Sequence, residues 1–320
     1  MVPPAHPGNP VPPRWRRVSI VLNRDSGTIA RLGPEEVAEG LRLIYEGQGI
    51  QADVQVVPGS GVKAALEAAR DSDSGAVIVG GGDGTVAAAA TIMAGQAKPL
   101  GILPLGTFNL AARDAGMPLD WEEAALALVD APVGQSDLLD FDGQLFCCVM
   151  VLGFYPALAL GRKSYHGNWV VRAWRSAIGV FRHAATFPPL DLVMHLELHA
   201  IRVRTSMAIL VNNDFEDLFG LIPRRSTLDG GYFTVYVSKH RTRWGLFLTL
   251  LSWLFGRWKE DREMTAIHTT EMTITARRRK RLPVMRDGEV EKLPLPLTVK
   301  LRPKALALLA PRLLEDDAAL

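Results

Sequence analysis

The chain has 320 residues, enough for one large or two ordinary domains, and its 48% hydrophobic and 22% charged residues are typical of a globular protein. Its only two cysteines are adjacent, which excludes a disulfide framework or a cysteine zinc site and indicates a reducing, cytoplasmic setting. The net charge of +2 is uneven, because residues 138–305 have a net charge of +10 and the rest of the chain −8. A basic second half suits a polyanionic partner such as membrane lipid or nucleic acid.

The first part of the chain reads as a tail followed by alternating strands and helices. Residues 1–13 contain six prolines and no apolar h-region, so they predict a disordered tail and not a signal peptide. Apolar strand-like runs then alternate with helical patterns, and this alternation predicts a parallel α/β sheet over residues 14–137. The expected strands are 17–22, 52–57, 77–79 and 100–103, and the expected helices are 34–48, 62–69 and 121–129.

After residue 136 the pattern changes to short strand-like runs separated by polar turns, which predicts an antiparallel sandwich over residues 138–301. The expected strands are 145–152, 190–198, 201–211, 232–237, 271–275 and 297–301. Two helical segments, 166–185 and 241–258, combine aromatic and basic residues. Such helices can lie in the headgroup layer of a membrane, or they can pack on the domain core or on a dimer partner. The longest apolar stretch, 244–258, is too short to span a bilayer.

Two glycine-rich turns follow neighbouring strands of the predicted sheet. Gly80-Gly81-Gly82-Asp83-Gly84-Thr85 follows the third strand, and Gly106-Thr107-Phe108-Asn109 follows the fourth. A turn from a strand to a helix directs free backbone N–H groups and the positive end of the helix at one point. Glycine lets the backbone approach a phosphate without a Cβ in between. Two adjacent turns of this kind, with Thr85, Thr107 and Asn109 as further donors or caps, predict a polyphosphate nucleotide site.

Asp83 lies beside this predicted phosphate site and would be repelled there unless it met a cation, so Mg²⁺ is its expected partner. Two common nucleotide motifs do not fit. The chain has no G-x-x-x-x-G-K-[ST] motif, and the residues about twenty positions after Gly82 lack the acid that binds a ribose in dinucleotide enzymes.

At this level of detail the chain resembles the diacylglycerol kinase family, which includes sphingosine kinases and bacterial soluble lipid kinases. The resemblance extends from about residue 15 to residue 312. The motifs that carry it are Asn23 with Ser26-Gly27, Gly81-Gly82-Asp83-Gly84-Thr85, Pro104 to Ala111, Gly153-Phe154, Leu228-Asp229-Gly230 and Asp287-Gly288-Glu289. It implies a two-domain lipid kinase fold in which ATP lies in the cleft and residues 302–313 return to the first domain.

The resemblance also implies roles for individual residues. Glu289 would be the general base, supported by Asp287, and Asp83 would be catalytic. Asp83 and Asp229 would bind Mg²⁺. The ATP-binding set would be Asn23, Ser26, Gly27, Gly81, Gly82, Gly84, Thr85, Gly106, Thr107 and Asn109. The implied function is phosphorylation of the hydroxyl of a diacylglycerol-like or sphingoid lipid, by a cytoplasmic enzyme that binds an anionic membrane surface peripherally.

Several positions depart from the family pattern and leave alternatives open. Leu110 stands where many members have Asp, and Gly230 stands where many have a second acid. A NAD kinase shares the Gly-Asp-Gly-Thr motif, and 211–214 is the run comparable to its Asn-Glu pair. A third alternative is a non-catalytic nucleotide or lipid sensor. No nucleic-acid-binding module is legible in the chain, so nucleic acid is not an expected partner.

Overall fold

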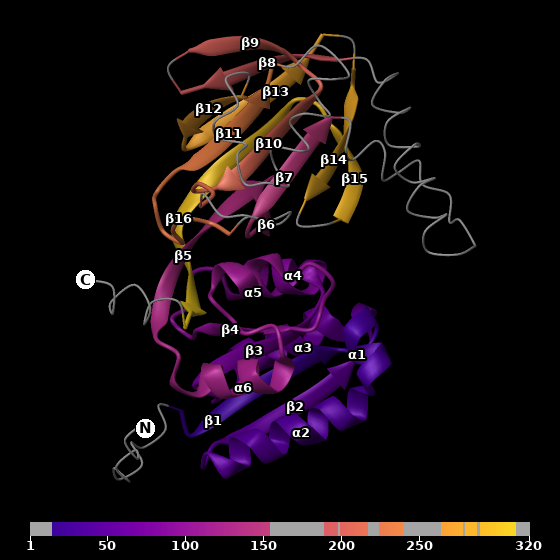
Figure 1. Cartoon of the computed structure of the whole chain (residues 1–320), viewed down its shortest axis with the longest axis vertical. Helices are drawn as coiled ribbons and strands as arrows, with labels where there is room; N and C mark the ends of the chain where they lie inside the picture. Colours follow the sequence, from indigo (N-terminus) through magenta and orange to yellow (C-terminus); the bar gives the residue numbers. More distant parts are fainter. Residues whose placement is uncertain are drawn as a thin grey trace, which may run out of the picture.

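The computed structural model describes residues 15–153, 189–197, 199–216, 224–239, 264–277, 279–286 and 289–311. They form an α/β domain and a β-sandwich domain, drawn at the bottom and the top of Figure 1. The predicted tail at 1–13 and the helical segments 166–185 and 241–258 lie outside the described residues.

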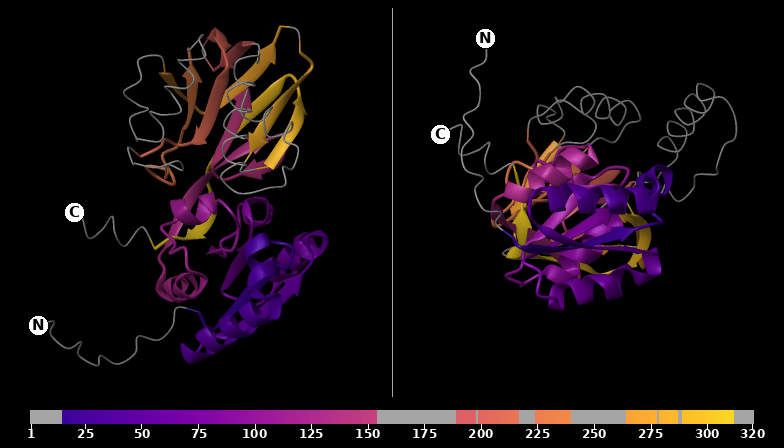
Figure 2. Two further views of the ribbon diagram at one scale, coloured as in Figure 1. Left: turned by 45° about the vertical axis from the view of Figure 1, so that its right-hand side comes forward. Right: turned by 90° about the horizontal axis from the view of Figure 1, so that it is seen from below.

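The α/β domain has the parallel sheet that the sequence predicts, with strand order β2-β1-β3-β4. All residues of β3 and β4 are buried, as expected for strands covered by helices on both faces. Helices α2 and α6 pack on one face, while α3 and α4 pack on the other (Figure 2). The elements are β1 (Arg17–Asn23), α1 (Gly27–Leu32), α2 (Pro34–Gly47), β2 (Gln51–Val57), α3 (Val62–Asp71), β3 (Ala76–Gly81), α4 (Asp83–Met93), β4 (Leu100–Pro104), α5 (Leu110–Asp114) and α6 (Trp121–Asp130).

The second domain is an antiparallel sandwich, also as predicted. Its six-stranded sheet has the order β12-β11-β10-β7-β14-β15, and it encloses an apolar core with β16, β13 and β8 of the other sheet. The elements are β5 (Val133–Phe141), β6 (Gln144–Phe146), β7 (Val149–Gly153), β8 (Leu190–Leu196), β9 (Ala200–Thr205), β10 (Met207–Asn212), β11 (Phe233–Ser238), β12 (Met264–Thr269), β13 (Glu271–Ala276), β14 (Arg281–Arg286), β15 (Glu289–Pro294) and β16 (Leu297–Leu309).

Two long strands, β5 and β16, run from the sandwich into the α/β domain (Figure 1). The first half of β16 pairs with β13, and Leu308 near its end pairs parallel with Leu100 of β4. The parallel sheet and one sandwich sheet are therefore continuous. The expected boundary at residues 137/138 falls inside β5.

Two expected strands are each divided in the structure. Residues 201–211 form β9 and β10, which belong to different sheets, because the chain crosses the sandwich at Thr205 and Ser206. The Thr205 hydroxyl stabilises this crossing by donating to the carbonyl of Ser238 at 2.6 Å. The run 145–152 is interrupted by the buried pair Cys147-Cys148, which lies between β6 and β7. An uninterrupted apolar run does not show where a chain changes sheets.

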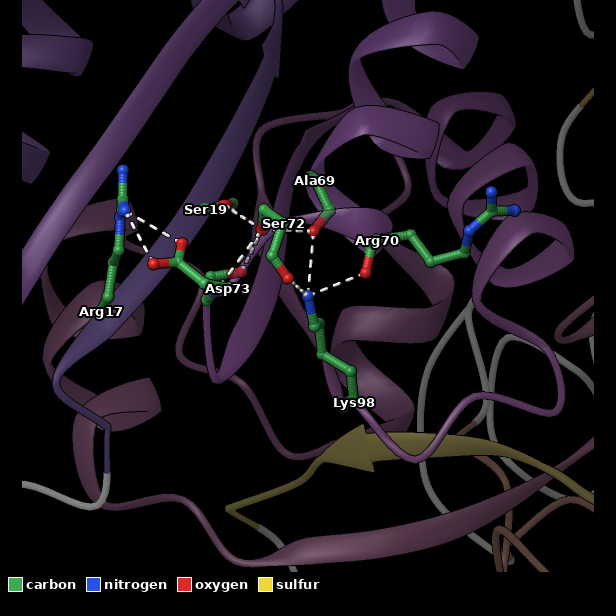
Figure 3. A network of polar contacts seen from close by, with 8 residues as sticks. Arg17, Ser19, Ala69, Arg70, Ser72, Asp73 and Lys98 are labelled. Carbon is green, nitrogen blue, oxygen red and sulfur yellow. Dashed lines mark hydrogen bonds and ion pairs between the residues drawn. The ribbon is translucent and has the colours of Figure 1, made fainter.

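A polar network holds the carboxyl end of α3, and Figure 3 shows it from close by. The Lys98 ammonium donates to the carbonyl oxygens of Ala69, Arg70 and Ser72 at 3.1, 2.8 and 2.8 Å. The last carbonyls of a helix have no partner within the helix, so a cation at this position satisfies them. Lys98 precedes β4, so the contact ties α3 to the start of that strand.

We expect Lys98→Met to destabilise the protein by about 1–3 kcal/mol, because it leaves three carbonyl groups without their charged donor. Urea unfolding measures the change. The control is Lys63→Met, since the Lys63 side chain is 77% exposed and its ion pair with Glu67 is 3.9 Å long. That variant should differ from the parent by less than about 0.5 kcal/mol. Equal effects of the two substitutions would contradict the stabilising role of Lys98.

Candidate active site

The predicted nucleotide residues of three loops meet at one edge of the parallel sheet. The carboxyl ends of β1, β3 and β4 lie side by side there, because the strands are parallel neighbours. Asn23 Nδ2 donates to Thr85 Oγ1 at 2.9 Å, and Ser26 Oγ donates to the carbonyl of Leu105. Thr28 Oγ1, which the sequence analysis missed, donates to the carbonyl of Gly106 at 3.3 Å. The edge of the sheet where α/β proteins bind ligands thus holds all three predicted loops.

The first glycine turn leads directly into α4, whose amino end is suited to an anion. Gly82 is the N-cap residue in an extended conformation, and no side chain caps the helix. Backbone N–H groups and the positive end of the helix dipole are therefore available to a phosphate. A Cβ on Gly81 would lie 2.7 Å from the Thr85 side chain, whereas a Cβ on Gly82 would meet nothing within 4 Å. Gly81 is required by packing, and Gly82 faces open space.

The second glycine turn touches the first. A Cβ on Gly106 would lie 2.7 Å from the Cα of Gly82, so the two backbones approach as closely as only glycine allows. Asn109 has a left-handed backbone with a φ of 54°. Its Oδ1 accepts from the N–H of Gly106 at 2.8 Å, and its Nδ2 donates to the carbonyls of Pro104 and Gly106 at 3.2 Å. The Asn109 amide therefore shapes the turn, while Thr107 is exposed.

We expect Gly82→Ala to weaken ATP binding by at least about tenfold without a change in stability above about 0.5 kcal/mol. The added methyl group would enter the open space beside α4, where the sequence predicts a phosphate, and the backbone of Gly82 suits alanine. Calorimetric titration with MgATP and urea unfolding measure the two quantities. Gly47→Ala in α2, which also meets open space, is the control and should bind ATP like the parent. Parent-like ATP affinity in Gly82→Ala would remove the first turn from the binding site.

Asp83 connects the two turns. Its Oδ1 accepts from the backbone N–H of Leu110 at 2.8 Å. Burial raises the pKa of the Asp83 carboxyl, and hydrogen bonds from the backbone of Leu110, Asn109 and Phe108 offset this only in part. The contact uses the backbone of residue 110, so it exists although Leu110 stands where many members of the family that the chain resembles have Asp.

Asp229 and Asp137 lie in the sandwich part of the domain junction. The Asp229 carboxylate forms an ion pair with the Lys304 ammonium at 3.8 Å. Asp137 is fully buried, and its carboxylate accepts from the backbone N–H of Lys304 and Gly231 and from Asn213 Nδ2, each at 2.8 Å. Within the part of the chain that the structure describes, no three His, Cys, Asp or Glu side chains group closely enough to hold a metal. The metal role of Asp229 stays a prediction.

The predicted base belongs to the hairpin of β14 and β15. Asp287 and the side chain of Glu289 lie outside the described residues, but the backbone of Glu289 pairs with Arg286. Arg286 donates to Gln144 Oε1 of β6 at 2.8 Å. In turn β6 packs against α4, the helix that begins at Asp83. In Figure 1 the paired ends of β14 and β15 at these residues point toward the α/β domain.

The sequence analysis missed one charged pair between the domains. The Asp114 carboxylate at the end of α5 accepts from Arg225 Nε at 2.7 Å and from the Arg225 backbone N–H at 2.9 Å. Burial alone would lower the pKa of the Arg225 guanidinium, but the Asp114 carboxylate outweighs it and raises that pKa above its usual range. The residues are 111 positions apart, and no local pattern links them.

Comparison with known proteins gives two adjacent matches. Residues 17–141 match the family model of the diacylglycerol kinase catalytic domain, and residues 159–310 match that of the YegS C-terminal NAD kinase beta sandwich-like domain. A crystal structure from Bacillus anthracis str. Sterne, of a protein assigned as a diacylglycerol kinase, has a TM-score of 0.70 and 17% identity. The match covers 93% of this chain and 98% of the other chain, and at this identity it shows the fold alone.

Curated relatives match over shorter stretches. The "Probable lipid kinase YegS-like" of Pseudomonas aeruginosa is 42% identical over 28% of this chain and 30% of its own length. The protein of the same name from Stenotrophomonas maltophilia is 32% identical over 42% of this chain and 44% of its own. The "Diacylglycerol kinase" of Mycobacterium tuberculosis is 42% identical over 35% of this chain and 36% of its own length. The matched part thus spans less than half the length of each relative. None of the helices among the described residues has the length and apolar character needed to cross a bilayer.

Proposed function

The chain belongs to the diacylglycerol kinase family, and on this premise we propose that it is an ATP-dependent lipid kinase that phosphorylates a diacylglycerol-like or sphingoid hydroxyl. The observation that carries the proposal is the contact between the two glycine turns at the amino end of α4. A Cβ on Gly106 would clash with the Cα of Gly82 at 2.7 Å, whereas a Cβ on Gly82 would enter open space. Backbone donors of this kind suit the β- and γ-phosphates of a nucleotide.

In the proposed reaction the lipid hydroxyl attacks the γ-phosphorus of ATP in line with the bond to the leaving oxygen of ADP. A new oxygen–phosphorus bond forms as the old one breaks, and Glu289 accepts the hydroxyl proton, with Asp287 in support. The backbone at Gly81, Gly82 and Gly84 and the remaining members of the predicted ATP-binding set hold the nucleotide. Mg²⁺ supplies neutralisation of phosphate charge, and Asp83 would hold it, since its partly buried carboxylate lies beside the turns.

The basic charge of the second half supports peripheral binding to an anionic membrane, from which a cytoplasmic lipid kinase would take its substrate. On the edge strand β9, Arg202 and Arg204 are exposed. Arg202, Arg277 and Arg204 all lower the pKa of the Asp191 carboxyl, Arg202 most through a hydrogen bond. Three arginines around one acid leave a net positive surface there.

A thin-layer assay with labelled ATP tests the proposal against its alternatives. We expect the label in a lipid when diacylglycerols and sphingoid bases are supplied in anionic vesicles. Label in NADP would instead support a NAD kinase, and ATP binding without transfer would support a sensor. The structure favours the first outcome, because Asn212 and Asn213 are buried and donate their amides to Asp137 and neighbouring carbonyls.

A further inference from the structure

We propose that the buried ion pair between Asp114 and Arg225 is a latch between the two domains, and that Arg225 is a positioning residue that holds Asp83 in place through α5. The inference deepens the proposed function and rests on it for the catalytic role of Asp83. Its structural part can be tested without any substrate.

The pair has the geometry of a specific two-point contact. One oxygen of Asp114 accepts from Arg225 Nε at 2.7 Å, and the other accepts from the Arg225 backbone N–H at 2.9 Å. The side chains of Arg225 and Asp114 are 2% and 4% exposed. Two hydrogen bonds to one carboxylate fix orientation as well as distance, and water does not compete with them in the interior.

On the α/β side the latch is connected to Asp83 by a single short helix. Asp114 is the last residue of α5, and Leu110 is the first. The N–H of Leu110 donates to Asp83 Oδ1 at 2.8 Å, and α5 packs against both α4 and β4. A rotation of α5 would therefore move the donor away from Asp83, and the latch opposes that rotation from the other end of the helix.

On the sandwich side Arg225 belongs to a segment that is itself held firmly. Arg225 forms an isolated β-bridge with Phe215, and the N–H of Ser226 donates to the carbonyl of Asp214 at 2.8 Å. Further along, Leu228 accepts from the N–H of Asp137, and Gly231 donates to the Asp137 carboxylate, both at 2.8 Å. The latch thus joins two fixed parts, and it restrains α5 against the sandwich.

Stability alone does not require an ion pair at this position. Replacing a buried ion pair by well-packed apolar residues is often neutral or stabilising, whereas removing one partner leaves a buried charge. An apolar pair would still fill the space but would not orient α5. This difference separates a positioning role from a structural one.

The test uses the full chain and the double variant Asp114→Leu/Arg225→Met. We expect its unfolding temperature to stay within about 5 °C of the parent. The Leu110 amide, measured against the Leu66 amide in α3, should exchange hydrogen at least about tenfold faster. If the protein phosphorylates lipid, kcat should fall at least about tenfold as well. Arg225→Lys keeps the charge but loses the fixed fork, so it should show the same faster exchange if the double variant does not fold.

The matched control is Arg202→Met, which removes a two-point contact with Asp191 of 3.0 and 2.7 Å at an exposed site of the sandwich. It should leave exchange at Leu110 unchanged. Parent-like exchange at Leu110 in the folded double variant, or in Arg225→Lys, would overturn the latch. Faster exchange in a chain whose parent phosphorylates no lipid would support the latch and overturn only the proposed function.

Discussion

Asp83→Asn is expected to lower lipid phosphorylation by at least about 100-fold while the fold survives, because in the proposed reaction charge stabilisation at the reacting phosphate depends on this carboxylate. Asparagine retains an oxygen that can accept from the N–H of Leu110, a bond of 2.8 Å in the parent. The contact between the two turns should therefore persist. What the substitution removes is the negative charge that would hold Mg²⁺.

The same substitution should not reduce stability near neutral pH. Burial raises the pKa of the folded Asp83 above its value in the unfolded chain. Between these two values the folded state binds more protons than the unfolded state, so stability falls as pH rises through that window. This destabilisation by the buried, ionised carboxylate is fully present above the raised pKa and absent below the unfolded value of about 3.9. Asp83→Asn removes this destabilisation, so the variant should match or exceed the parent in stability at pH 7, but gain nothing at acid pH.

Labelled-phosphate transfer and urea unfolding at two pH values measure these effects. The control is Asp73→Asn, since the Asp73 side chain is 75% exposed and pairs with Arg17 away from the turns. It should leave turnover unchanged and alter stability by less than about 0.5 kcal/mol. Turnover in Asp83→Asn at the parent rate would show that this carboxylate takes no part in the reaction.

The part of the site that the sequence predicts is the part built from short segments. Gly81 to Thr85 spans the junction between the buried strand β3 and helix α4, so its residues lie together wherever the chain goes next. Parallel pairing of β3 and β4 then brings Gly106 beside it. The glycines are informative because a close approach of two backbones tolerates no other residue.

The residues that sequence analysis missed are those whose partners are distant in the chain. No motif or pattern near Asp114 in the sequence marks it as part of a buried ion pair, and its partner Arg225 follows 111 residues later. Asp137 follows Ser136 in β5 and receives N–H donors from Asn213, Gly231 and Lys304. Such contacts depend on how β5 and β16 cross between the domains, and no period or motif in the chain contains that information.

For the same reason, the sequence does not determine how the strands of the second domain are divided between its two sheets. The run 201–211 is apolar enough for one strand, yet β9 and β10 pair in different sheets. Alternation in a sequence reports which faces are buried, but it does not report which strand lies alongside.

Glu289→Gln is the second substitution with a large expected effect. A general base contributes about 10²–10⁴-fold to a rate, so we expect kcat to fall by at least about 100-fold with little change in ATP affinity. ATP would be held by the α/β domain, whereas Glu289 begins β15 in the sandwich, opposite Arg286. Glutamine preserves size and hydrogen-bonding capacity but cannot accept the hydroxyl proton. Turnover and calorimetric ATP titration separate the two effects.

Glu271→Gln is the matched control, because Glu271 pairs with Lys300 at 2.9 Å in a half-exposed ion pair elsewhere in the sandwich. It should turn over like the parent. If Glu289→Gln retains parent activity while Asp287→Asn loses it, the proton acceptor is Asp287 and the roles in this hairpin are exchanged. If Glu289 is the base, Glu289→Gln should also lose the decline of kcat/KM at acid pH, because that decline reports protonation of the group that accepts the proton in the free enzyme. The residual activity of Glu289→Gln would then be flat over the acid range in which the parent loses activity.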